Sequence, residues 1–262
     1  MHYHIHGNQA ADAETIILSS GLGGSGGYWA PQIEALGERY RLVTYDHTGC
    51  GKTGGEVPET GGIRAMADAT GASKNNIWLA DAQELKEFHF IGHALGGLMA
   101  LDIGLRQPGR IAKQVLINAW SKADPHSGRC FDVRIELLEK SGVPAFVKAQ
   151  PLFLYPAIFM AENPERMAAE EAHAIAHFQG KTNILRRIAA LRAFDVDAKL
   201  ATIETPTLLI ATRDDLLVPY SRSLRLAEGL PNATLNVSDF GGHAVNVTYP
   251  AAFNQTVLDF LS

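Results

Sequence analysis

Short apolar runs bounded by glycine or proline recur along this chain of 262 residues, and they restrict its fold more than any other feature. The runs cover Thr15–Leu18, Arg41–Tyr45, Phe88–Ile91, Gln114–Asn118, Pro206–Ala211 and Ala233–Val237. Their length and composition are typical of strands buried on both faces. Longer segments with helical spacing of apolar residues lie between several of them, at Leu95–Arg106, Tyr220–Leu230 and Ala251–Leu261. This alternation predicts an α/β fold, a mostly parallel twisted sheet with helices on both faces.

The alternation stops between residues 120 and 200. This stretch is rich in Ala, Glu, Arg, Met and Leu, and prolines divide it into short helical segments, at Pro125, Pro144, Pro151, Pro156 and Pro164. We expect a helical cap at 120–200, inserted between two strands of a core made of 1–119 and 201–262. The helical pattern is poorest over about residues 54–87.

Charge, hydropathy and cysteine content exclude several classes of protein. The net charge is -5 and there is no basic block, so nucleic-acid binding is not expected. No apolar run reaches the roughly 18 to 20 residues of a membrane span, and the amino terminus does not resemble a leader, so we expect a cytoplasmic protein with no membrane contact. Cys50 and Cys130 are too few for a disulfide framework and lack metal-site spacing.

The loop after Phe88–Ile91 has the pattern of a nucleophile elbow. Gly92-His93-Ala94-Leu95-Gly96 follows a strand and precedes a helix, as G-x-S-x-G does in α/β-hydrolases. The central residue is Ala94, which has no hydroxyl. We expect His93, beside it, to pack or hydrogen-bond locally.

An acid and a histidine follow the elbow in the chain order of a hydrolase triad. Asp214 and Asp215 come after the run ending at Ala211, and His243 comes after the last run. We favour Asp215 over Asp214 because it lies four residues before Pro219, a position that resembles that of the acid in many α/β-hydrolases. Carboxyl ends of parallel strands meet at one edge of a sheet, so the three loops are expected to converge.

A glycine-rich loop, Ser20–Gly26, follows the first apolar run. It stands where such enzymes form part of an oxyanion hole from backbone N–H groups. The expected donors are the amides of Leu22 and Leu95. Ser20, Ser25 and Cys50 are weaker candidates for a replacement nucleophile, since none lies on an elbow. His2, His4 and His6 alternate, which favours the exposed face of an edge strand over a metal site.

The whole chain resembles α/β-hydrolases, and within them the branch that contains the D protein of the Rut pathway of uracil degradation. The similar segments are Ser20–Gly26, Gly92–Gly96, Ala149–Pro156, His177–Lys181, Asp214–Pro219 and Gly241–Val247. The resemblance implies hydrolysis of a small labile nitrogen compound, carbamate or aminoacrylate. Both substrates are anions, so a cationic side chain that binds the substrate is expected in the cap, with Lys181, Arg186 and Arg187 as candidates. Trp29 and Tyr155 are candidates for lining the pocket.

Without a serine, His243 and Asp215 would activate a water molecule held beside Ala94. Such a site needs no metal and no organic cofactor, and its partner is a small-molecule substrate. Two alternatives stay open. The chain could be a non-catalytic, ligand-binding relative of these enzymes, or Ala94 could replace the serine of an ordinary hydrolase. Either a monomer or a homodimer is compatible with the sequence.

Overall fold

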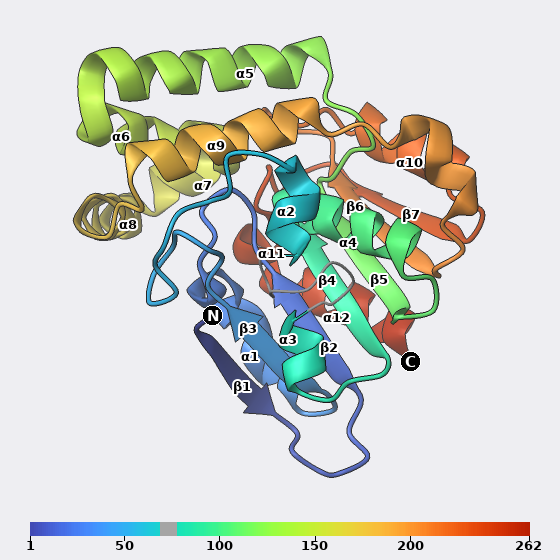
Figure 1. Cartoon of the computed structure of the whole chain (residues 1–262). Coiled ribbons are helices and arrows are strands. Elements are labelled where there is room, and N and C mark those ends of the chain that lie inside the picture. Colours follow the sequence, from blue (N-terminus) through green and yellow to red (C-terminus); the bar gives the residue numbers. More distant parts are fainter. Residues whose placement is uncertain (69–77) are drawn as a thin grey trace.

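The computed structural model describes residues 1–68 and 78–262. Within these residues, seven strands form one sheet in the order β1-β3-β2-β4-β5-β6-β7 (Figure 1). All neighbouring pairs are parallel except β1 and β3, which are antiparallel. The strands are β1 (Tyr3–Gly7), β2 (Thr15–Ser19), β3 (Arg41–Tyr45), β4 (Phe88–His93), β5 (Ile111–Ile117), β6 (Thr207–Thr212) and β7 (Ala233–Ser238).

All six predicted apolar runs lie in strands of this sheet, and the predicted α/β fold is confirmed. One expectation was wrong: β7 is not buried on both faces, because it forms an edge of the sheet and every second residue is more exposed. The opposite edge is β1, where His4 is exposed and His6 hydrogen-bonds through Nε2 to Thr44 Oγ1 at 3.0 Å. The described residues contain no cluster of three or more His, Cys, Asp or Glu able to hold a metal ion.

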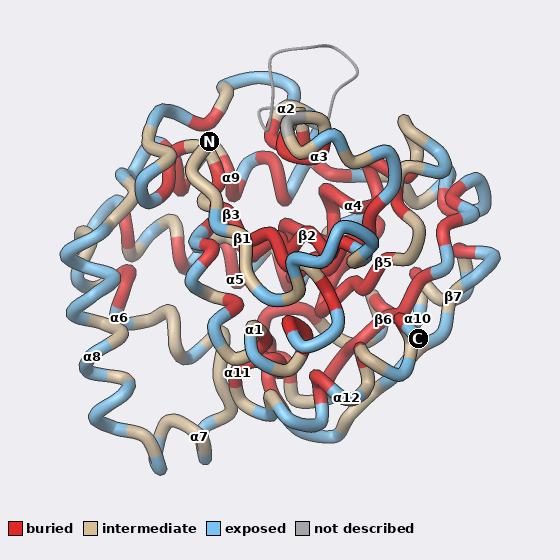
Figure 2. Tube along the Cα trace, turned by 90° about the horizontal axis from the view of Figure 1, so that it is seen from below, coloured by how far each residue is buried: buried red, intermediate tan, exposed pale blue. Residues whose placement is uncertain are grey.

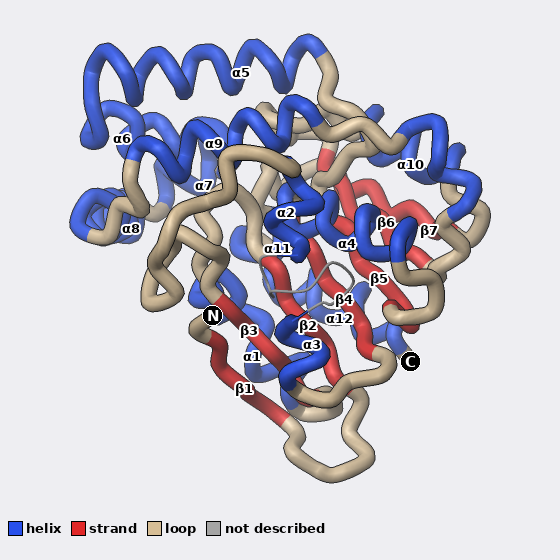
Figure 3. The backbone as a smooth tube through the Cα atoms, in the orientation of Figure 1, coloured by secondary structure: helices blue, strands red, loops and turns tan. Residues whose placement is uncertain are grey.

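Helices cover both faces of the sheet (Figure 3). One face carries α1 (Ala30–Gly37), α11 (Val245–Thr248) and α12 (Pro250–Leu261), which pack on one another. The other carries α2 (Gly62–Asp68), α4 (Leu95–Arg106) and α10 (Ser221–Gly229). Buried apolar side chains accordingly form two clusters, with Ile16, Leu18 and Ile91 in one and Ile17, Phe90 and Leu116 in the other. Alternate residues of each central strand therefore face opposite layers.

The chain between β5 and β6 is almost entirely helical. It contains α5 (Pro125–Glu136), the short π-helical segment η2 (Leu137–Ser141), α6 (Gly142–Leu154), α7 (Ala157–Glu162), α8 (Pro164–Ala176) and α9 (Lys181–Ala193), before the 3₁₀ turn η3 (Asp197–Thr202). Figure 1 shows α5–α9 at the end of the sheet where the parallel strands finish. The division into a core and a separate cap stays a prediction about folding units.

The outer part of this helical segment is far less buried than the sheet (Figure 2). Helices α7 and α8 contain no buried residue. The poorly patterned stretch over about residues 54–87 contains α2 and α3 (Trp78–Ala82), and its part at 69–77 lies outside the described residues. In the described part of the chain, no helix has the length and apolarity needed to cross a bilayer.

Candidate active site

The turn between β4 and α4 has the strained geometry of a nucleophile elbow. Ala94 has φ 45° and ψ -106°, a region that non-glycine residues rarely occupy. The turn closes because Gly92 and Gly96 have no side chains: a Cβ on Gly92 would lie 2.4 Å from the carbonyl carbon of Gly96. Strain of this kind costs about 1–3 kcal/mol and is concentrated at functional sites. The elbow is therefore built although its central residue has no hydroxyl.

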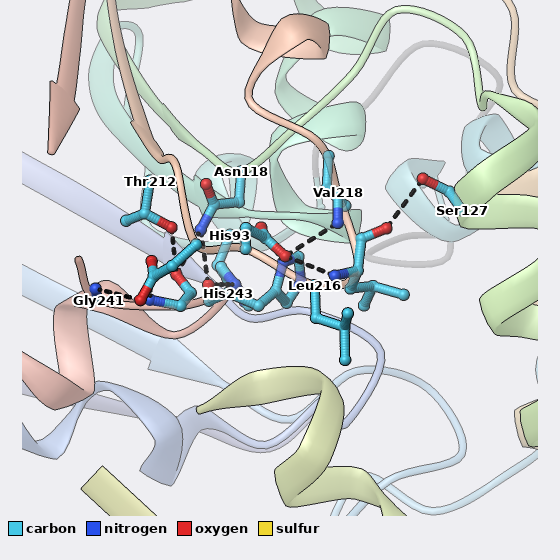
Figure 4. Close-up of polar contacts among 12 residues, drawn as sticks. His93, Asn118, Ser127, Thr212, Leu216, Val218, Gly241 and His243 are labelled. Carbon is cyan, nitrogen blue, oxygen red and sulfur yellow. Dashed lines mark hydrogen bonds and ion pairs between the residues drawn. The ribbon is translucent and has the colours of Figure 1, made fainter. Parts of the chain in front are cut away.

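The structure brings Asp215 and His243 together, as the sequence predicts. Asp215 Oδ2 lies 2.7 Å from His243 Nδ1, and both side chains are almost fully buried (Figure 4). The other carboxylate oxygen of Asp215 accepts from the N–H groups of Leu217 and Val218 at 2.7 and 2.9 Å. The imidazole is thus oriented by a carboxylate that is itself fixed by two backbone amides.

Asp214 has a different role from its neighbour. Its carboxylate accepts hydrogen bonds from the N–H groups of Gly241 and Gly242, at 3.2 and 2.8 Å. These bonds tie the loop after β6 to the loop that carries His243. The structure therefore distinguishes the two adjacent acids by their partners.

Sequence reasoning missed Asn118, which follows β5 and holds the histidine loop. Its Nδ2 donates to the main-chain carbonyl of His243 at 2.8 Å, and it has a positive φ of 47° (Figure 4). Thr212 Oγ1 donates to the carbonyl of Gly242 at 2.8 Å. The available signal was position alone, because both residues stand at the carboxyl ends of strands.

His93 packs and hydrogen-bonds beside the elbow. Its Nε2 donates to the main-chain carbonyl of His243 at 2.8 Å, and its ring stacks on Tyr28 with centroids 5.0 Å apart. Burial, and secondarily the nearby His243, lowers the pKa of His93 well below its usual range. His93 is therefore a neutral support for the histidine loop. Tyr28, which donates to Asn246 Oδ1 at 2.7 Å, is a further neighbour that the sequence did not reveal.

The glycine-rich loop Ser20–Gly26 runs against the elbow. A Cβ added to Gly21 would lie 2.9 Å from His93 Nδ1 and 3.7 Å from the Cβ of Ala94. Leu22 directly follows this contact, and Leu95 is the first residue of α4, where N–H groups have no partner inside the helix. Both expected oxyanion donors thus belong to segments that adjoin Ala94.

The side chain of Arg187 anchors this loop from α9. It is fully buried; Nη1 donates to the carbonyl of Leu22 at 3.1 Å and Nη2 to the carbonyl of Thr48 at 2.6 Å. Burial lowers the pKa of Arg187 to about 10, which leaves it cationic at neutral pH. These contacts make Arg187 a support of the loop that contains Leu22.

The other expected binding residues have protein partners of their own in the structure. Lys181 is exposed, with Nζ 3.7 Å from Glu139, while Arg186 donates to Glu56 and to the Val57 carbonyl, both at 2.9 Å. Both cations are thus in contact with surface partners, which argues against a role as substrate ligands.

The two aromatic candidates, Trp29 and Tyr155, also have partners within the protein. Trp29 is fully buried in the core cluster on the α12 face, not the cluster that contains Ala94. Tyr155 donates its hydroxyl to Glu170 on α8 at 2.9 Å. Of the weaker nucleophile candidates, Ser25 Oγ caps the N–H of Gly27 and Cys50 Sγ donates to the Gly23 carbonyl.

A buried histidine behind the glycine-rich loop predicts acid sensitivity. Burial, with a smaller effect of Arg187, lowers the pKa of His47 from 6.5 to about 3. Between these values the unfolded chain binds a proton that the folded chain does not. The free energy of unfolding therefore decreases as the pH falls through this range, by up to about 1.4 kcal/mol per pH unit from His47 alone. Urea unfolding at several pH values should show a smaller acid loss for His47→Gln than for the unmodified chain.

The control is His173→Ala, since His173 is exposed on α8. That variant should keep the pH dependence of the unmodified protein. An unchanged pH dependence in His47→Gln would show that His47 does not contribute.

Comparison with known proteins agrees with this geometry. The family model described as serine aminopeptidase, S33, matches residues 10–246. A protein of Rhizobium rhizogenes named "Putative carbamate hydrolase RutD" is 67% identical over 100% of this chain and 97% of its own length. The chain belongs to the RutD family of α/β-hydrolases. A relative of the same name from Pseudomonas savastanoi pv. phaseolicola is 52% identical over 100% of this chain and 99% of its own.

Solved structures support the same assignment of fold. The enol-lactonase from Burkholderia xenovorans superposes with a TM-score of 0.88 at 25% identity, covering 99% of this chain and 95% of the enzyme. Membership of the RutD family confirms the resemblance inferred from the motifs and makes the chain a hydrolase. The elbow, the Asp215–His243 pair and the glycine-rich loop are then its candidate catalytic parts.

Proposed function

We propose that this RutD-family hydrolase accelerates the breakdown of carbamate or aminoacrylate by water attack, without a serine nucleophile. The observation that carries the proposal is the buried Asp215–His243 pair, 2.7 Å apart, in a fold whose elbow presents Ala94. Acid, base and strained turn are all present, and only the hydroxyl is lacking. A catalyst of this kind must take its nucleophile from solvent.

His243 is the proposed general base. With Nδ1 donating to Asp215, its Nε2 is free to accept a proton from water. Water moves its proton to Nε2 as its oxygen bonds to the carbon that carries nitrogen. The imidazolium then returns the proton to nitrogen as ammonia leaves. Carbamate and water give ammonia and bicarbonate; aminoacrylate and water give ammonia and the enol of malonic semialdehyde, which tautomerises by moving its hydroxyl proton to carbon.

Ala94 leaves room for this water. A water molecule takes up about 30 Å³ in the liquid and needs polar partners, which His243 and the adjoining amides supply. The N–H groups of Leu22 and Leu95 are the proposed donors to negative charge that develops during the reaction. Preorganised donors of this kind need no reorientation as the charge forms.

The lability of the proposed substrates matches the modest power of such a site. General base catalysis contributes about 10²- to 10⁴-fold, far less than a stable amide requires. Carbamate and aminoacrylate decompose slowly by themselves, so a small acceleration is useful. The relatives named as carbamate hydrolases support this substrate class.

The setting we propose is uracil degradation in the cytoplasm. The protein would act there as a monomer or homodimer, on a small-molecule substrate and without a cofactor. The Rut name of the relatives supports the pathway.

Replacing Ala94 with serine tests the water-based reaction. The new hydroxyl would occupy the position proposed for the attacking water, so ammonia release from carbamate or aminoacrylate should fall about 10- to 100-fold, as for other misplaced reacting groups. Ammonia is measured for each substrate after subtraction of the spontaneous rate, with Ala169→Ser on the exposed surface of α8 as the control.

The same variant distinguishes the alternatives. A gain of activity with covalent phosphonate labelling of Ala94→Ser would show machinery built for serine and contradict the proposal. An unmodified protein that releases no ammonia from either substrate, yet binds ligands, would be a non-catalytic relative.

A further inference from the structure

Arg134 is a buried cation that has no role in the proposed mechanism. It lies on α5, on the same helical face as Ser127 and Cys130. Ser127 Oγ donates to the carbonyl of Leu217 at 2.9 Å, and Cys130 Sγ lies 3.7 Å from the carbonyl of Leu216. This face of α5 therefore packs on the loop that holds the catalytic acid.

The guanidinium of Arg134 is enclosed by aromatic rings. Only 3% of the residue is exposed. Its Cζ lies 5.8, 5.9 and 5.4 Å from the ring centroids of Phe131, Phe146 and Phe153. Nη2 donates to Oε1 of Gln150, its one polar partner among the hydrogen bonds of the described residues. A planar cation thus lies among apolar side chains of α5 and α6.

Two donor groups of Arg134 are left over. Nε and Nη1 are buried with no hydrogen-bond partner in the described part of the chain, and no carboxylate there forms an ion pair with the guanidinium. Arg187, by contrast, directs Nη1 and Nη2 to main-chain carbonyls. Burial lowers the pKa of Arg134 to about 10, so it stays charged at neutral pH. An unpaired buried charge lowers the stability of the fold unless a bound group of opposite charge compensates it.

The segments around Arg134 contact the histidine loop as well as the acid loop. Phe153, whose ring is nearest the guanidinium, precedes Leu154, and the Leu154 carbonyl accepts from the N–H of Ala244 at 3.0 Å. Ala244 is next to His243. The elements that enclose Arg134 therefore contact the loops of both catalytic residues.

We propose that Arg134 binds the anionic group of the substrate. The ligand class is a small monoanion, a carboxylate or a carbamate, with an oxygen that accepts from an unpaired donor of the guanidinium. A hydrogen bond from a guanidinium to an anionic oxygen is charge-assisted and stronger than one between neutral groups. The identity of the natural ligand rests on the proposed function, whereas binding of a small carboxylate does not.

Acetate, with neutral acetamide as its isostere, tests this site in the full-length chain. Calorimetry and thermal melting at constant ionic strength should show that acetate binds and acetamide does not. In Arg134→Met the affinity for acetate should fall about 10- to 100-fold, the usual effect of losing hydrogen bonds to a charged group. Arg129→Gln, on the exposed side of the same helix, should bind acetate as the unmodified chain does.

Melting in the absence of anion separates binding from a structural role. Replacing an unpaired buried charge with an apolar side chain of similar length should leave the melting temperature of Arg134→Met unchanged or raised. A lower melting temperature with unchanged acetate affinity would overturn the proposal, as would failure of acetate to bind the unmodified chain. If Arg134→Met does not fold, a crystal structure of the unmodified chain with acetate decides: acetate within hydrogen-bond distance of the Arg134 guanidinium supports the site, and acetate only elsewhere overturns it.

Failure of this proposal is distinguishable from failure of the proposed function. His243→Ala should bind acetate normally, since it retains Arg134. Acetate binding that depends on Arg134, in a protein that releases no ammonia, would refute the reaction and keep the anion site. Ammonia release with KM unchanged in Arg134→Met would keep the reaction and refute the site.

Discussion

His243→Ala should lower ammonia release from the preferred substrate by about 10²- to 10⁴-fold, the usual contribution of a general base. The side chain of His243 is the group placed to accept the proton of the attacking water, with Nδ1 held by Asp215 at 2.7 Å. Asp215→Asn should also lower the rate, because an amide no longer favours the imidazole tautomer whose Nε2 accepts a proton. The measurement is initial ammonia release at saturating substrate, corrected for spontaneous decomposition.

The controls make the same kinds of substitution at surface positions. His173→Ala on α8 and Asp259→Asn on α12 should retain the full rate, since both side chains are exposed. Equal rates for His243→Ala and the unmodified enzyme would refute the water mechanism.

Gly96→Ala should produce the largest loss of stability among single methyl additions. A Cβ at Gly96 would lie 2.2 Å from the carbonyl oxygen of Ser19 and 2.7 Å from its carbon, so α4 or β2 must move. Overpacking typically lowers the free energy of unfolding by about 1–3 kcal/mol. We expect a loss at or above the upper end of this range, because the added methyl group clashes with the main chain. Urea unfolding should show a markedly lower midpoint or no folded protein.

Gly128→Ala is the matched control. Gly128 lies within α5 and has no neighbouring atom within 4 Å of an added Cβ. The substitution should raise stability by about 0.5–1 kcal/mol, because glycine is a poorer helix former than alanine. Equal midpoints for the two variants would show that the elbow tolerates a methyl group at Gly96.

The local sequence pattern was sufficient to predict most strands of the sheet and the candidate site residues in the loops that follow them. The six apolar runs are strands because each concentrates apolar side chains within a few residues, a property of the sequence itself. The elbow glycines, Asp215 and His243 were found because they follow strands in a fixed order, and parallel strands bring such loops to one edge. The half-exposed β7 was misjudged because its position at the sheet edge depends on strand order.

The sequence by itself determined the fold class, the alanine at the elbow, and the Asp215–His243 pair that the structure brings together. Tertiary structure alone decided which of the chain's cations are buried and which have acidic partners. Lys181 and Arg186 are cations in the sequence just as Arg134 is, but they contact surface acids, whereas Arg134 is enclosed by three phenylalanine rings with two donors unused. Composition records a charge, but its partners and its hydration depend on side chains brought together from distant parts of the chain.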